Sequence, residues 1–229
     1  MSERPKILAL GSVDEEAIHG SCGLHATWEE LGTKSLGTGK LYKELFGKQD
    51  DTFRRLDPQT RSIVLAVEAT GIDQLLNEEE REAAALVTET IWGSYEVDKK
   101  YTRSLDADLP HGAIFPYTLQ STCIGDVALR HGLRGPTVCL SIEPTARGSA
   151  LREAERMLSA GEVRHAVVAT VDALVSVEDA GSDAEPVLRA VVAVASAGSF
   201  PQKELLPWPA PDEDPFAALA RSCRSLPKR

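Results

Sequence analysis

Residues 130–173 constrain the fold of this chain more than any other stretch. A turn that contains Gly135 and Pro136 leads into a short run of β-branched and apolar residues at 137–142, whose length and flanks favour a buried strand. Pro144 can neither donate a ladder hydrogen bond nor lie inside a helix. The strand is therefore expected to stop at this elbow, and a helix to begin just after it.

The second half of the stretch has the pattern of a helix followed by another strand. Leu151, Ala154 and Leu158 share one helical face, Gly161 is typical of a helix end, and residues 165–171 form a second short apolar run. The stretch is therefore predicted to be a β-α-β unit, which places the chain in the α/β class. Further apolar runs at residues 6–13, 83–91 and 187–195 are also predicted to be strands, so about five strands are expected in all.

The same stretch resembles a known family. HGLRGP, the strand, the elbow, a helix ending in LSAGE and the run HAVVATVDAL are similar to the segment around the nucleophile of the β-ketoacyl synthases, members of the thiolase superfamily. There the strand ends in a cysteine whose thiolate takes the acyl chain from an acyl carrier protein. Counted from Gly135 and Pro136, that position falls on Pro144. The resemblance implies a thiolase-like half, with a mixed sheet of about five strands flanked by helices, that lacks the nucleophile.

The resemblance also indicates which other groups the chain lacks. The family needs two histidines and a supporting lysine, all from its second half, and we expect this chain to end before that half. Its five histidines fall outside matching positions. We therefore expect no catalytic residue at the elbow, no cofactor and no metal site.

Three residues near the elbow are alternatives for residual chemistry. Cys139 lies inside the strand, where a cysteine is usually an inert small hydrophobe. Ser141 has no His and Asp companions in a triad arrangement. Glu143 lies at the expected helix start, where the helix dipole favours an anion, and it is the candidate acid or base.

Residues 115–131 resemble the family helix that lines the acyl pocket at the dimer interface. Ile124 and Val127 supply a buried helical face, and Gly125 allows close approach by a neighbouring element. Leu119 falls where the family places a side chain that gates acyl-chain entry, although an apolar core residue is an equal alternative. The candidate channel or interface residues are Leu119, Thr122, Cys123, Cys139, Ser141, Glu143 and Pro144.

The clearest local helix signal lies upstream, at residues 57–71. Asp57 is a typical N-cap, Pro58 suits the first helical position and Gly71 suits the stop, so an amphipathic helix is predicted between them. Arg54 and Arg55 precede it. They are either anion contacts for the phosphopantetheine of a carrier protein or an ordinary solvated surface.

Composition excludes some partners. There are 25 Lys plus Arg residues against 35 Asp plus Glu, a net charge of −10, which argues against binding to nucleic acid or to an anionic membrane. The four cysteines have no metal-ligand spacing, and no signal peptide or long apolar segment occurs. We expect a cytoplasmic protein with reduced thiols.

The chain is expected to comprise a ketosynthase-like domain at 1–196 and a Pro-rich tail at 197–229. Six of the thirteen prolines lie in the tail, which is expected to be extended up to a short helix at 216–224 and to dock on the domain or on a partner.

These patterns lead to one main functional hypothesis and two alternatives. The main one is an inactive, chain-length-factor-like subunit that pairs with an active ketosynthase and shapes its acyl channel in fatty-acid or polyketide synthesis, such as an aryl-polyene pathway. The alternatives are a stand-alone enzyme that uses Glu143 on an acyl substrate, and a homodimeric protein that binds acyl groups or acyl carrier protein.

Overall fold

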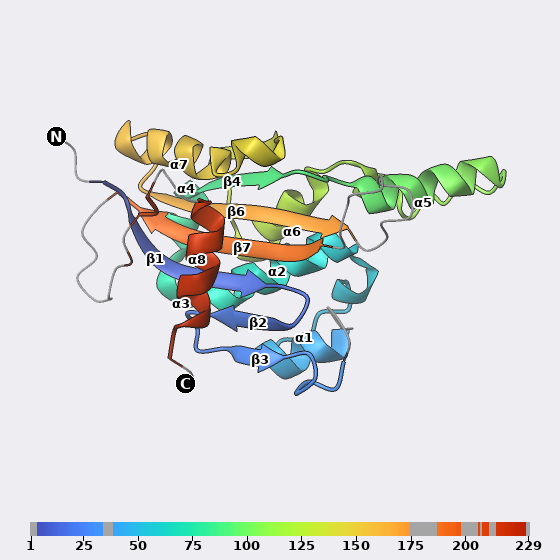
Figure 1. Cartoon of the computed structure of the whole chain (residues 1–229), viewed down its shortest axis with the longest axis horizontal. Helices are drawn as coiled ribbons and strands as arrows, with labels where there is room; N and C mark the ends of the chain where they lie inside the picture. Colours follow the sequence, from blue (N-terminus) through green and yellow to red (C-terminus); the bar gives the residue numbers. More distant parts are fainter. Residues whose placement is uncertain are drawn as a thin grey trace.

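One mixed sheet organises the chain in the computed structural model, which describes residues 4–33, 39–174, 187–197, 206, 208–210 and 214–227. Its strands are β1 (Lys6–Val13), β2 (Ala17–Gly20), β3 (His25–Thr27), β4 (Ala85–Thr90), β5 (Thr137–Ser141), β6 (His165–Leu174) and β7 (Val187–Ser196). They lie in the order β3-β2-β1-β7-β6-β4-β5, with β6, β4 and β5 parallel and the other neighbours antiparallel (Figure 1). The α/β class and the mixed sheet are confirmed.

The sheet has seven strands among the described residues, whereas the sequence predicted about five. The five predicted runs are all present, and β2 and β3 are the additions. These two strands hold only four and three residues, so they are too short to show an alternating pattern in a Gly-rich, polar stretch.

The helices occupy both faces of the sheet. They are α1 (Gly39–Phe46), α2 (Pro58–Thr70), α3 (Ile72–Leu75), α4 (Glu78–Ala83), α5 (Tyr95–Asp106), α6 (Thr122–His131), α7 (Ser149–Ser159) and α8 (Pro215–Arg224). Short 3₁₀ turns, η1 (Phe53–Arg55), η2 (Phe115–Thr118) and η3 (Pro144–Ala146), lie between them. One apolar cluster joins α2 and α6 to the sheet, and a second joins α7 and α8 to its other face.

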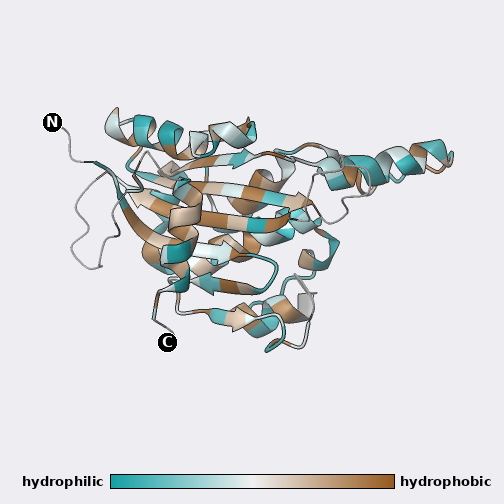
Figure 2. Ribbon diagram, in the orientation of Figure 1, coloured by the Kyte–Doolittle hydropathy of each residue, from teal (hydrophilic) through white to brown (hydrophobic). Residues whose placement is uncertain are grey.

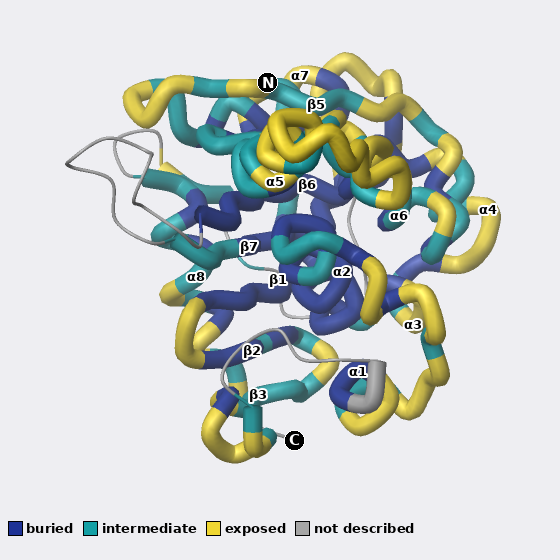
Figure 3. The backbone as a smooth tube through the Cα atoms, turned by 90° about the vertical axis from the view of Figure 1, so that its right-hand side faces the viewer, coloured by how far each residue is buried: buried dark blue, intermediate teal, exposed yellow. Residues whose placement is uncertain are grey.

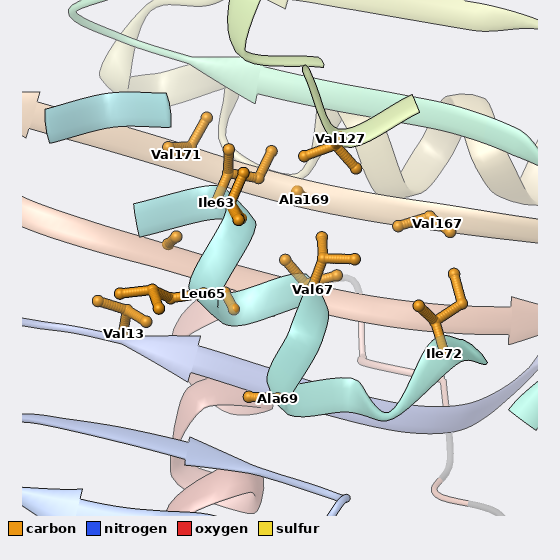
Figure 4. Packing of buried hydrophobic residues seen from close by; sticks show 14 of the residues in the cluster. Val13, Ile63, Leu65, Val67, Ala69, Ile72, Val127, Val167, Ala169 and Val171 are labelled. Carbon is orange, nitrogen blue, oxygen red and sulfur yellow. The ribbon is translucent and has the colours of Figure 1, made fainter. Parts of the chain in front are cut away.

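Helix α2 is the central element of the first cluster. The Asp57 side chain accepts hydrogen bonds from the backbone N–H groups of Gln59 and Thr60, and Gly71 closes the helix in the left-handed region, as predicted. The predicted amphipathic character is wrong, because residues on every side of α2 are buried. Figure 4 shows apolar side chains of α2 packed against those of neighbouring strands.

Two glycines let α2 lie directly on the sheet. A Cβ atom at Gly11 would lie 1.9 Å from the carbonyl oxygen of Ala66, and one at Gly20 would lie 2.0 Å from that of Ala69. Only glycine permits this approach of backbone to backbone. The β1–β2 end of the sheet is therefore tightly closed by α2.

The opposite face carries α7 and α8. Leu151, Ala154 and Leu158 of α7 are buried against the sheet, as their spacing predicted. On α8, Phe216, Leu219 and Cys223 are buried in the same cluster. The division of the chain at residue 197 remains a prediction, but α8 contributes side chains to the core.

Helix α5 differs from all of these because it projects beyond the end of the sheet (Figure 1). Only Val97 of α5 is buried, and the tube of α5 is largely coloured as exposed in Figure 3. Tyr101 on α5 contacts Phe115 on η2, with ring centroids 5.4 Å apart. We call residues 95–119, which comprise α5, η2 and the loop between them, the arm.

Candidate functional site at the strand ends

The elbow lies where three parallel strands end. Ser141, the last residue of β5, is in register with Thr90 of β4, and the neighbouring Glu89 is in register with Thr170 of β6. Ligands of open parallel sheets bind beyond the carboxyl ends of the strands. The residues gathered here therefore define the candidate site.

Strand β5 forms the outer edge of the sheet. The sequence predicted a buried strand, and this is wrong: Thr137 and Ser141 are exposed and the three residues between them are half-buried. The reason is topological, because β5 pairs only with β4 among the described strands. Its other edge leaves backbone N–H and C=O groups available to a further strand.

Gln120 joins β5 to the end of the arm. The Ser141 hydroxyl donates to Gln120 Oε1 at 2.7 Å, and the Cys123 thiol donates to the Gln120 carbonyl oxygen at 3.1 Å. The Cys139 thiol is a longer 3.9 Å from the same oxygen. The structure thus brings together Cys123, Cys139 and Ser141, three of the predicted site residues.

Neither of these two cysteines has the surroundings of a nucleophile. Burial raises the pKa of the Cys123 thiol, and burial also raises the pKa of Cys139 despite a hydrogen bond with Thr88. A raised pKa disfavours the thiolate, which is the reactive form. The thiols therefore act here as small apolar side chains with weak hydrogen bonds.

Glu143 and Pro144 lie at the elbow, but not at the start of the long helix. Pro144 begins the 3₁₀ turn η3, and Glu143 precedes it without a side-chain capping bond. Both residues are exposed. The prediction that Glu143 lies at the helix start is therefore wrong, because α7 begins only at Ser149.

Glu89 provides the carboxylate at the start of α7. Its oxygens accept hydrogen bonds from the N–H groups of Gly148 at 3.0 Å and Ala150 at 2.8 Å. The side chain is fully buried, and burial raises the pKa of Glu89 although these two hydrogen bonds act in the opposite direction. Glu89 thus holds the segment between the elbow and α7 in place, at a helix start where the helix dipole favours an anion.

Asp172 holds the loop that follows β4. Its Oδ1 accepts from the Thr90 hydroxyl at 2.9 Å and from the N–H groups of Ile91 at 2.8 Å and Trp92 at 3.1 Å. Thr90 in turn accepts from the Gln59 side chain at 3.3 Å, which extends the network to α2. These hydrogen bonds form one network that holds the loop after β4 in place next to the site.

Leu119 and Thr122 lie on the outer side of the site. The Leu119 residue is 64% exposed, so the alternative that it is a core residue is wrong. The Thr122 hydroxyl donates to the Pro116 carbonyl oxygen and ties α6 to the arm. Gly125 has no atom within 4 Å of a Cβ built on it, so nothing in the described chain makes the close approach predicted there.

The exposed apolar side chains lie on two segments that adjoin this site. The exposed large hydrophobic residues of the described chain are Leu105, Leu109, Phe115, Leu119 and Leu129. All of them lie on the arm or on α6. Figure 2 shows hydrophobic residues interspersed with hydrophilic ones along the projecting α5.

A cationic groove lies beside the arm. It has a volume of about 440 Å³ and is lined by Arg54, Arg55, Arg61 and Lys100 together with the acidic Asp57 and Glu96. Arg54 and Arg55 are exposed, in accord with the solvated-surface alternative, yet they face a concave surface. Of the described residues, four positive and two negative side chains line the groove.

The charged cluster around His131 is structural. His131, the last residue of α6, has a 1% exposed side chain whose Nδ1 is 3.0 Å from Asp73 Oδ1. Lys48 Nζ donates to Asp73 Oδ2 at 2.9 Å and to Glu68 Oε2 at 3.0 Å. The cluster joins α6 to α2 and α3.

Among the residues that the structure describes, no three His, Cys, Asp or Glu side chains are grouped so that they could hold a metal ion. No helix in that part of the chain is long and apolar enough to cross a membrane.

The comparisons with known proteins agree with this architecture. The sequence profile of the family "Beta-ketoacyl synthase, N-terminal domain" matches residues 24–184, well over half of the 229 residues. The chain therefore belongs to the β-ketoacyl synthase N-terminal domain family. No curated protein matches the chain in sequence.

Solved structures of low sequence identity share the fold. One is a ketosynthase (ApeO) in complex with its chain length factor (ApeC) from Xenorhabdus doucetiae, with 14% identity, a TM-score of 0.58, and 86% of this chain and 80% of that chain covered. The ishigamide ketosynthase/chain length factor has 16% identity and a TM-score of 0.65, with 90% of this chain and 65% of that chain covered.

A third similar structure is AntDE:AntF, a type II polyketide acyl carrier protein in complex with its hexaketide-bound ketosynthase. It has 13% identity and a TM-score of 0.59, with 86% of this chain and 63% of that chain covered. The chain thus spans less than two thirds of the second and third of these proteins. The three similarities define a ketosynthase-like fold.

Three site residues were missed in the sequence: Glu89, Gln120 and Asp172. Glu89 and Asp172 carried a signal, since each is an acidic residue inside an otherwise apolar run, AALVTETI and HAVVATVDAL. A charge in such a run is costly unless it is paired or hydrogen-bonded. Gln120 carried no signal, because its role depends on contacts with Cys139 and Ser141, which lie 19 and 21 residues further along the chain.

Proposed function

We propose that this chain is an inactive ketosynthase-like subunit that pairs with an active β-ketoacyl synthase and shapes the channel for its acyl chain. The observation that carries this proposal is the position of the exposed apolar residues. The five large ones in the part of the chain that the structure describes all lie at 105–129, and Gln120 links this segment directly to the open edge of β5. An open strand edge beside an apolar surface is typical of a protein–protein interface.

The chemistry of the elbow supports an inactive role. Pro144 occupies the position that the family gives to its nucleophile, and burial raises the pKa of both neighbouring thiols. Two of the similar structures are described as ketosynthases with a chain length factor, and by analogy this chain takes the second role. Fatty-acid or polyketide synthesis, including aryl-polyene synthesis, is then the proposed context.

Co-expression with the active ketosynthase of the same gene cluster tests this function. We expect a stable 1:1 complex by size-exclusion chromatography with light scattering, and condensation of malonyl and acyl carrier-protein substrates by the complex only. The isolated chain should show no condensation. Condensation by the isolated chain that is abolished by Cys139→Ala would refute the proposal. A homodimer that does not bind the ketosynthase would instead support an independent binding protein.

We further propose that the groove beside the arm contacts the acyl carrier protein. Four cationic side chains, Arg54, Arg55, Arg61 and Lys100, line it and suit an acidic partner or a phosphopantetheine phosphate. Arg54→Glu combined with Arg55→Glu should slow condensation by the complex at low carrier-protein concentration and leave the 1:1 assembly intact. Equal rates for the variant and the parent complex would exclude this contact.

A further inference from the structure

A second arginine-rich pocket lies between the start of α7 and the segment that precedes α8. It has a volume of about 110 Å³ and is lined by Arg4, Arg147, Gly148, Leu151, Arg152, Glu155, Trp208, Pro209, Ala210 and Pro215. None of these residues belongs to β5, to the arm or to the groove beside it. Among the described residues, three arginines and one acidic residue, Glu155, line this small space.

The side chain of Arg147 lacks an acceptor for part of its guanidinium. Its Nη1 atom is buried and, within the described part of the chain, has no hydrogen-bond partner. Its Nε is 3.9 Å from Asp214 Oδ2, a distance too long for a hydrogen bond. A buried donor without an acceptor is costly, so a ligand that supplies one would be stabilised here.

The neighbouring carboxylates are engaged elsewhere. Glu89 accepts from the N–H groups of Gly148 and Ala150, and Asp214 Oδ1 accepts from the N–H groups of Phe216 and Ala217 at 3.1 Å each. Glu89 therefore caps the first turn of α7, and Asp214 caps the first turn of α8. They reduce the positive potential near Arg147 but do not satisfy its Nη1.

The other cationic groups add to the positive charge around this space. Arg152 is held in place by its Nη2, which donates to the Ala146 carbonyl oxygen at 3.1 Å and to the Ser149 hydroxyl at 2.9 Å. On the adjacent β7, burial lowers the pKa of Arg189, and the positive charge of Arg147 lowers it further. Nε and Nη2 of Arg189 are also buried without partners among the described residues.

From this geometry we infer that the pocket formed by Arg4, Arg147 and Arg152 binds a phosphate group, either as the free ion or as a phosphomonoester. Guanidinium groups match the oxygens of phosphate in pairs, and a dianion gains most from several of them. The pocket is large enough for one phosphate group, so the rest of an ester would lie outside, beside Trp208. This binding site is independent of the proposed partner interface.

Titration calorimetry on the full chain with inorganic phosphate tests this site, in a low-salt buffer free of other oxyanions. We expect 1:1 binding that Arg147→Gln weakens by at least about tenfold, the effect of removing hydrogen bonds to a charged group. Arg4→Gln should also weaken binding, and it keeps the test valid if Arg147→Gln fails to fold, because Arg4 is exposed and outside every helix and strand.

Arg156→Gln is the matched control. Arg156 lies on α7 and pairs with Glu153 and Glu162 outside the pocket, so its loss removes the same charge without touching the site. Titration with glycerol 3-phosphate then shows whether a monoester binds as well as the free ion. Absence of phosphate binding by the parent chain, or equal weakening in Arg156→Gln, would overturn the inference.

Discussion

The two ends of the sheet are built differently. At the β3–β2–β1 end, α2 lies so close to the strands that Gly11 and Gly20 have no room for a Cβ atom, and the last strand, β3, has only three residues. At the other end, β5 is half-exposed and α6 carries a glycine with open space around it. The large apolar residues that are exposed in the described chain lie on the arm and on α6. One end is completed within the chain, whereas the other has the features of a surface that another protein covers.

Two buried carboxylates hold the elbow at the open end in place. Glu89 and Asp172 hold the elbow and the loop after β4 by five hydrogen bonds from backbone N–H groups and the Thr90 hydroxyl. Such a network positions the edge strand and its flanking segments whether or not a cysteine is present. The geometry at the open end is therefore held by Glu89 and Asp172, and it does not depend on a nucleophile at the elbow.

The largest effect is expected at the closed end, from Gly11→Ala. The added Cβ would lie 1.9 Å from the backbone oxygen of Ala66, which cannot rotate away, so we expect a loss of about 3 kcal/mol or more in the free energy of unfolding. Urea denaturation measures it. Gly112→Ala, at a glycine with nothing within 4 Å, is the control, and similar losses in both variants would contradict a closed end.

At the open end, Leu119→Asp should separate association from stability. Leu119 is 64% exposed and adjoins Gln120, which contacts β5, so a carboxylate there should weaken the complex with the ketosynthase by at least about tenfold. The free chain should unfold at an unchanged urea concentration. Ala160→Asp places the same charge at the exposed end of α7 and should leave association intact; equal binding by both variants would place the interface elsewhere.

At both ends of the sheet, the sequence allowed local features to be predicted better than long-range arrangement. The apolar run at Lys6–Val13 and the caps Asp57 and Gly71 each depend on neighbouring residues, and each was found where it was expected. The burial of α2 on every side could not be read in this way, because it depends on strands from distant parts of the chain. The same holds for β5, whose composition suits a core strand although topology places it at the edge.

At the site, the local sequence pattern identified the elbow at Pro144 but not the carboxylate that holds the following helix start, Glu89. Pro144 does follow the end of the strand, yet the helix α7 begins only four to five residues later, at Gly148 and Ser149, where Glu89 of β4 accepts a hydrogen bond from Gly148. Glu143 was therefore the wrong carboxylate for that position. A long-range hydrogen bond of this kind leaves no periodic pattern in the sequence.

The charged cluster around His131 joins α6 to α2 and α3, and it predicts how the stability of the chain depends on pH. A hydrogen bond from His131 holds the pKa of Asp73 well below its usual range, against the opposing effect of burial, and Lys48 contributes in the same direction. Since the folded pKa lies below the unfolded one, the stabilisation is present at neutral pH and is lost as the pH falls below about 4. Arg81 and Glu68 also face this cluster.

Asp73→Asn should therefore be less stable than the parent chain at pH 7, with a difference that narrows in acid. Urea denaturation between pH 7 and acid conditions measures this convergence. Asp106→Asn, at an exposed residue at the end of α5, is the control and should follow the parent chain at every pH. A constant difference between Asp73→Asn and the parent chain would show that the carboxylate's charge does not couple α6 to the closed end.

The smallest expected effect is at Gly125, and it has the opposite sign. Gly125 lies inside α6 with nothing within 4 Å of a Cβ built on it, so Gly125→Ala should raise the free energy of unfolding of the free chain by about 0.5–1 kcal/mol. If the ketosynthase approaches α6 closely, the same methyl group should weaken the complex. A variant that is stabilised alone but impaired in pairing would show that this glycine is retained for the partner, and a variant that is destabilised alone would show that the chain itself covers this end.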